Sequence, residues 1–221
     1  LVRIVVRSFP SRDPSSFTAS SGLLARESLG WADFSFEAMD SLLAISWQPS
    51  AIDAIWLDKL LKQQLLARRD AYWCGYLHDR FESHSMVRRL INAAFELPLD
   101  HLEHDIAERW CTMILWFTAA ADRRVKDWAT RASTAILSAQ PQVLPHVLKR
   151  FLVCDDDEVR ERTLLSCYGA LIFSRDAYIV QQVTASLQET YRSVPRAFDN
   201  ALIRDQIRCI SELAIELNVL P

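Results

Sequence analysis

Two histidines form the only cluster in the sequence whose spacing could hold a metal ion. His101 and His104 stand three residues apart among Asp100, Glu103 and Asp105. Residues three apart share one face of a helix, and imidazole and carboxylate groups bind zinc. The helical zinc-binding signature is missing, however, and acidic residues after a proline are typical of a helix start. We therefore predict a helix N-terminus without a metal, and keep a metal-dependent enzyme at this pair as an alternative.

The other reactive groups also favour structural roles. Cys74 and Cys167 lack a neighbouring histidine base, and the five cysteines form no metal knuckle, so we expect reduced and mostly buried thiols. The acidic run 155–158 lacks the glycine of a calcium loop and favours helix capping. The sequence has no glycine-rich phosphate loop, dinucleotide fingerprint or serine elbow. We predict no enzymatic activity and no cofactor for this segment.

A recurring helix opening indicates how the chain is built. A polar residue is followed three positions later by an aliphatic residue and then by a basic one. The copies are Asp122-Val125-Lys126, Asp156-Val159-Arg160 and Asn200-Ile203-Arg204, with a looser copy at His84-Val87-Arg88. The aliphatic positions are 38, 34 and 44 residues apart, near the period of roughly 40 residues in HEAT repeats. A single helix pair cannot bury its apolar face, so we predict an all-α, HEAT-like α-solenoid of stacked antiparallel helix pairs.

The chain divides into two parts. Residues 1–33 combine a β-prone run, Val2 to Val6, with a Ser/Pro/Arg-rich stretch, and we expect a linker or the tail of a preceding element. Residues 34–221 form the predicted helical repeat domain. The periodicity places its helices at about 35–47, 52–67, 69–81, 85–97, 103–120, 123–138, 142–153, 157–173, 176–191 and 199–217. The chain starts with Leu and stops just after a helical pattern, so we expect a segment of a longer polypeptide.

Charge and hydropathy restrict the expected surroundings. The longest uncharged apolar run, 110–121, is shorter than the roughly 20 residues of a membrane span, and no signal peptide is present. We therefore expect a cytoplasmic protein that does not enter a membrane. The net charge of −3 gives no general drive towards nucleic acid. Trp56, Trp110 and Trp128 fall on apolar helix faces and are predicted core residues, whereas Trp47 is less clearly buried.

Three local patterns resemble the helical-repeat region of bacterial NACHT or STAND NTPases that act in antiphage defence. They are Asp53-Ala-Ile-Trp-Leu with Arg69-Asp-Ala-Tyr-Trp, Val153-Cys-Asp-Asp-Asp-Glu-Val-Arg-Glu-Arg162 with Cys167-Tyr-Gly-Ala, and Asn200-Ala-Leu-Ile-Arg-Asp205. The resemblance covers about 50–215. It implies that an ATPase domain precedes this segment and that the segment serves as a sensor arm or scaffold. Because the phosphate-binding motifs are missing here, it implies no nucleotide hydrolysis by these residues.

We therefore predict a non-catalytic scaffold that recognises a protein partner or the remaining domains of its own chain, with oligomers formed through the parent protein. All but four of the 25 basic residues are arginines, which suit bidentate contacts with carboxylates. The candidate contact residues are Arg88, Arg124, Arg160, Arg204 and Trp47. The alternative is a HEAT-like nucleic-acid-binding module that uses Arg88, Arg89, Arg123 and Arg124.

Overall fold

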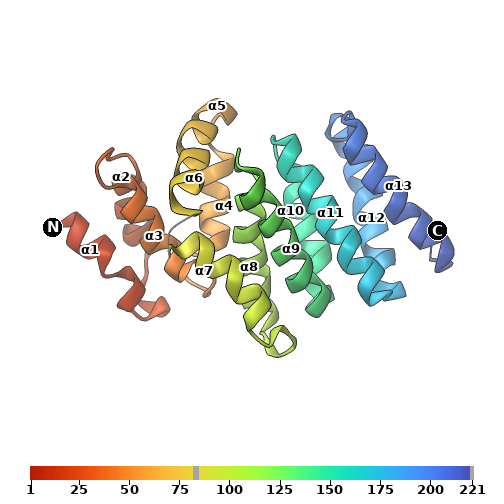
Figure 1. The fold of residues 1–221 in the computed structure, drawn as a ribbon, viewed down its shortest axis with the longest axis horizontal. Coiled ribbons are helices and arrows are strands. Elements are labelled where there is room, and N and C mark those ends of the chain that lie inside the picture. The colour runs from red at the N-terminus through yellow and green to blue at the C-terminus, as the bar shows by residue number, and fades with distance from the viewer. Residues whose placement is uncertain (82–84, 220–221) are drawn as a thin grey trace.

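The computed structural model describes residues 1–81 and 85–219, and all secondary structure in these two ranges is helical (Figure 1). The predicted all-α class is therefore confirmed for the described chain. His84, the opening residue of the loosest repeat copy, lies outside the described residues. Within the described ranges, no helix has the length and apolar character that crossing a membrane requires.

The helices stand side by side in two rows along the long axis of the molecule (Figure 1). The first row contains α7 (Met86–Glu96), α9 (Arg123–Ala139), α11 (Asp157–Ser174) and α13 (Ala201–Glu216). The second row contains α4 (Ala54–Lys62), α8 (His104–Phe117), α10 (Leu144–Leu152) and α12 (Ala177–Ser193). Each helix contacts its neighbours within the row and its sequence neighbour in the other row. One continuous hydrophobic core between the rows is the result.

The recurring helix openings are N-caps, as their residue types predict. Asp122, Asp156 and Asn200 each precede a helix and accept a hydrogen bond from a backbone N–H of its first turn. The aliphatic residue three positions later is fully buried in each described copy: Val125, Val159 and Ile203. The polar residue therefore sets the start of the helix, and the aliphatic residue sets which face turns to the core.

The N-terminal segment differs from the prediction. The β-prone run lies in a short helix, α1 (Val2–Arg7), and the expected linker contains a second helix, α2 (Ala19–Leu29). Together with Phe9 and Phe17, these helices form a small core against α3 (Ser35–Ser46). The packing outweighs the weak β preference of the valines, because helix propensity differs by less than about 1 kcal/mol per residue. Residues 1–33 are thus an ordered extension of the helical stack.

One buried arginine joins distant parts of the two rows. A short helix, α5 (Leu66–Arg69), continues through a wider π-helical turn (Asp70–Cys74) into α6 (Gly75–Phe81). The side chain of Arg69 is fully buried; its guanidinium lies 5.2 Å from the ring centroid of Trp116. It donates hydrogen bonds to Asp155 Oδ1 at 2.7 Å and Asp156 Oδ2 at 3.3 Å. The N-cap residue of α11 thus also holds α5 in place.

Candidate binding surface on helices α7 and α9

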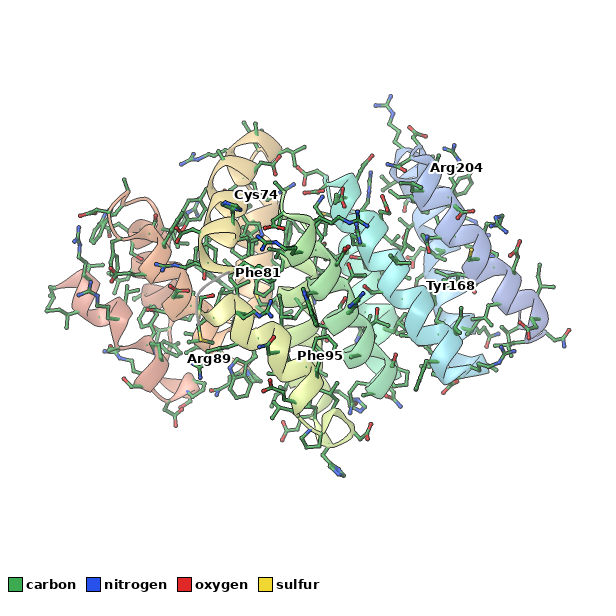
Figure 2. The ribbon with its side chains drawn as sticks, in the orientation of Figure 1. Cys74, Phe81, Arg89, Phe95, Tyr168 and Arg204 are labelled. Carbon is green, nitrogen blue, oxygen red and sulfur yellow. The ribbon has the colours of Figure 1, made fainter. Side chains whose placement is uncertain are left out.

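Arginines and aromatic rings alternate where α6, α7 and α9 meet. We call this set the arginine–aromatic cluster: Phe81, Arg88, Phe95, Arg124, Trp128 and Arg131. Figure 2 shows Phe81 and Phe95 along the side of the molecule that α7 occupies. The exposed fractions of Phe95 and Trp128 are 48% and 36%. The outer part of the cluster is therefore accessible, whereas Phe81 is buried in the core.

Trp128 is the centre of the cluster. The guanidinium carbons of Arg88 and Arg131 lie 5.5 and 5.6 Å from its ring centroid, within the range of a cation–π contact. Phe95 contacts the same ring edge-to-face at a centroid distance of 5.7 Å. Arg88 also lies 4.9 Å from the ring of Phe81. These contacts restrict the rotamers of both arginines, so each guanidinium is held ready for an incoming group.

The charges on this surface are only partly compensated. Arg124 hydrogen-bonds Asp122 at 2.8 Å, and that hydrogen bond lowers the pKa of the Asp122 carboxyl. Among the described residues, neither Arg88 nor Arg131 forms an ion pair or a side-chain hydrogen bond. The guanidinium carbons of both lie over aromatic rings; Arg131 is exposed and Arg88 is half-buried. Guanidinium groups bind carboxylates bidentately.

An apolar pocket lies on the opposite flank of α7. Its volume is about 230 Å³, and the residues around it include Trp47, Leu90, Leu97, Ile106 and Trp110. The indole N–H groups of Trp47 and Trp110 both donate to backbone carbonyls, so they offer no hydrogen bond to a ligand. Arg89 is the one charged residue of its lining, and within the described chain it has no ion pair. The pocket suits an apolar side chain with an acidic neighbour.

The five residues predicted to contact a partner are therefore not gathered in one site. Arg88 and Arg124 belong to the arginine–aromatic cluster, and Trp47 lines the pocket beyond α7. Arg160 pairs with Asp157 in its own helix, with only 12% of its side chain exposed. Arg204 donates to backbone carbonyls just before α13, at the far end of the stack (Figure 2). These last two side chains therefore lie apart from the arginine–aromatic cluster and are already hydrogen-bonded within the chain.

Three of the six cluster residues, Phe81, Phe95 and Arg131, were not identified from the sequence, and the central residue, Trp128, was assigned to the core. Trp128 was predicted to be a core residue, but its ring covers the outer side of α9 because Ala129 and Ala132 occupy the buried positions beside it. A signal was present, since Trp128 and Arg131 are three residues apart on a predicted helix and share a face. What places Phe95 against them is the contact between α7 and α9.

The histidine pair opens a helix, as predicted. His101 lies in a 3₁₀ turn (Leu99–His101) and His104 is the first residue of α8. A chain bend separates the two, so they do not share the face of one helix. In the part of the chain that the structure describes, no three His, Cys, Asp or Glu residues gather where a metal ion could bind.

The cysteines are free, and three of them, Cys111, Cys154 and Cys167, are buried. Cys74 is half-buried, and its Sγ donates to the carbonyl oxygen of Ala119 at 2.9 Å. Burial, with a smaller contribution from Asp70, raises the pKa of the Cys74 thiol to about 11. A thiol with such a pKa is not a nucleophile at neutral pH, because the thiolate is the reactive form.

Comparison of the chain with protein-family models, with curated proteins and with solved structures gives no match. The resemblance to NACHT or STAND proteins therefore stays a prediction that depends on the local motifs. The geometry of this chain supplies the remaining argument about function.

Proposed function

We propose that this chain is a HEAT-like α-solenoid of stacked antiparallel helix pairs that recognises a protein partner and has no catalytic role of its own. In this proposal it is the scaffold or sensor region of a larger cytoplasmic NTPase that acts in antiviral defence. The repeated N-caps and the two helix rows support the architecture. The motif resemblance supports the parent protein.

The observation that carries the binding function is the arginine–aromatic cluster. Arginine and tryptophan are enriched among the residues that dominate protein interfaces, often at about 2 kcal/mol or more each. Here Arg88 and Arg131 are held on the exposed ring of Trp128 without a carboxylate partner among the described residues. An acidic surface of a partner protein would supply the missing carboxylates. Aromatic contact with Phe95 would exclude water around these ion pairs.

A nucleic-acid-binding function is the second candidate. Arginine next to aromatic rings also suits phosphates and stacked bases. The surroundings favour protein instead, because Arg123 and Arg124 are already paired with Asp127 and Asp122. Acidic groups within the basic patch repel a phosphate backbone, which needs several uncompensated cations in a row.

The test compares Arg88→Ala/Arg131→Ala with a control that has the same net charge. Arg12→Ala/Arg192→Ala removes two exposed arginines outside the cluster. Affinity capture from extracts of the source cells should recover a partner with the wild-type chain and with the control. Titration of the purified partner should then show a loss of at least about 100-fold for the cluster variant, equivalent to about 2.7 kcal/mol.

Two results would contradict this proposal. The first is a partner that binds the cluster variant and the control equally well. The second is tight binding of a short labelled DNA or RNA duplex at low salt that weakens steeply as salt rises, because that behaviour indicates phosphate contacts. Sequencing outward from Leu1 tests the parent protein separately: an upstream phosphate-binding loop is expected.

A further inference from the structure

A second concave site lies at the N-terminal end of the stack, away from the arginine–aromatic cluster. The cleft is formed by the end of α2, the start of α3, the end of α4 and α5. Figure 1 shows these elements in the red-to-yellow third of the chain. The cavity volume is about 490 Å³, within the range of roughly 300–1,000 Å³ that is typical of small-molecule sites. The residues that define it chemically are Arg26, Leu60, Gln63, Gln64, Arg68 and Tyr72.

Four polar side chains of this cleft are unused by the fold. Arg26 and Arg68 come from different helices and border the same cavity, and none of the described Asp or Glu residues lines it. For the described chain, neither guanidinium has an ion pair, and the side-chain amides of Gln63 and Gln64 have no hydrogen-bond partner. All four side chains carry N–H donors. The cleft therefore combines two positive charges with free donors and no compensating anion.

Arg26 and Arg68 are exposed residues at the border of this cavity, whereas three arginines at less exposed places in the chain are paired. Arg69, Arg109 and Arg150 lie in buried or half-buried positions, and each has at least one carboxylate partner at 2.7 Å. Like charges repel, and a cavity with low-dielectric walls strengthens that repulsion. Two arginines without a carboxylate partner among the described residues therefore border one cavity, and an anionic ligand would compensate both charges.

Part of the lining of the cleft is apolar. Leu29, Leu60 and the ring of Tyr72 form this part. The hydroxyl of Tyr72 donates to the carbonyl oxygen of Ser35 at 3.2 Å, and its ring contacts Phe36 edge-to-face. Burial raises the pKa of Tyr72 well above its ordinary value, so the hydroxyl adds no negative charge. A ring fixed in this way offers a flat surface to an apolar or aromatic group.

We propose that this cleft binds a small organic anion that carries a phosphate or carboxylate group on an apolar body. Arg26 and Arg68 bind the anionic oxygens through their guanidinium edges, and the two glutamine amides donate further hydrogen bonds. The apolar body packs against Leu60 and Tyr72. Because Arg26 is on α2 and Arg68 is on α5, the bound anion also ties the N-terminal helices to the rest of the stack.

The experiment measures the binding of three probes by isothermal titration calorimetry at constant ionic strength. Phenyl phosphate and phthalate carry an aromatic body with a phosphate or with carboxylates, and inorganic phosphate lacks the body. We expect saturable 1:1 binding of phenyl phosphate or phthalate, and at least tenfold weaker binding of inorganic phosphate. The stronger of the two aromatic probes identifies the anionic group that the cleft prefers.

Substitutions then locate the site. Arg26→Ala and Arg68→Ala should each weaken binding about tenfold or more, since a hydrogen bond to a charged group contributes about 1.5–3 kcal/mol. Arg68→Lys should give an intermediate loss, because lysine keeps the charge but not the planar fork. Arg192→Ala, an exposed arginine on α12, is the charge-matched control. Since neither cleft arginine has a partner in the described fold, both variants should keep the wild-type melting temperature.

Three outcomes would overturn the proposal: no saturable binding of either aromatic probe, equal binding by the wild type and both cleft variants, or the same loss in the Arg192→Ala control. The result is independent of the proposed partner surface. Arg88→Ala/Arg131→Ala should leave probe binding unchanged, and Arg26→Ala should leave capture of the protein partner unchanged.

Discussion

Replacement of Arg69 by methionine should weaken the whole stack, because this buried side chain joins α5 to the start of α11. Methionine is unbranched and fills the space along Trp116, so the change removes the charge and leaves most of the packing. What is lost is the contact between α5 and the loop before α11. The partners in that loop are Asp155 and Asp156, 86 and 87 residues away along the chain.

The magnitude follows from the exposure of each partner. The side chain of Asp155 is 51% exposed and can return to water, so its pair with Arg69 contributes less than about 1 kcal/mol. Asp156 is different, because only 11% of its side chain is exposed and its charge stays partly buried after the substitution. The cation–π contact with Trp116, which is shielded from solvent, adds up to about 2 kcal/mol. We expect Arg69→Met to lower the free energy of unfolding by about 3 kcal/mol.

The assay is urea denaturation of four proteins at neutral pH: the wild type, Arg69→Met, Asp156→Asn and the double variant. Asparagine caps a helix as well as aspartate does, so Asp156→Asn keeps the start of α11 and removes the charge. In the double variant no buried carboxylate remains unpaired. It should therefore be more stable than Arg69→Met alone by about 1–2 kcal/mol, and the coupling energy of the cycle should equal that gain plus the loss that Asp156→Asn causes alone.

Two measured values would refute this reasoning. A loss below about 1 kcal/mol for Arg69→Met would mean that the ion pair only balances its own desolvation. A coupling energy near zero would mean that the arginine and Asp156 do not interact across the stack. The denaturant slope must stay at the wild-type value for either comparison to hold, because a changed slope indicates a changed unfolding reaction.

Three further outcomes are expected. A Cβ at Gly169 would lie 3.0 Å from Thr134 Cγ2, so Gly169→Ala should not raise the free energy of unfolding of the wild type. In a Thr134→Ser background, which lacks that methyl group, the same substitution should raise it by about 1 kcal/mol, as measured by urea denaturation. A gain in both backgrounds would contradict the close approach. Because the pKa of Cys74 is about 11, we expect iodoacetamide to alkylate this thiol at neutral pH much more slowly than it alkylates free cysteine. A rate equal to that of free cysteine would show an exposed thiol. Burial raises the pKa of Asp156, so the folded state holds that proton more tightly. The stability of the wild type relative to Asp156→Asn should therefore fall as pH rises from the ordinary carboxyl range through the raised pKa, and a rise over this window would show the opposite shift.

The positions of the helices could be predicted from the sequence alone, because their signals are local. An N-cap such as Asp122 or Asn200 and an apolar stripe with helical spacing involve residues of one segment only. Predicted and observed boundaries from α3 onward differ by only a few residues, except that the long helix predicted at 52–67 ends as α4 at Lys62. The surface ion pair between Arg208 and Glu212, four residues apart on one helix, follows from the same local rules.

The prediction failed where propensity competes with packing. A run of valines near the N-terminus has a weak β preference, and nothing in Val2–Val6 itself reveals that Phe9 and α3 offer an apolar surface to a helix. The same limit applies to Trp128. Its position on the apolar side of a helical pattern is visible in the sequence, but the small residues Ala129 and Ala132 fill the space between the rows and leave the ring outside.

By itself, the sequence determined that this chain is helical, where most helices begin, and which aliphatic residues turn inward, because each of these depends on neighbours within about four positions. Only the tertiary structure decided which side chains meet. Arg88 reaches Trp128 because α7 packs on α9, Arg69 reaches Asp156 across 87 residues, and Arg26 and Arg68 border one cavity although they lie 42 residues apart. An apolar helix face must be covered by another element, but the residues on that face do not identify which helix covers it.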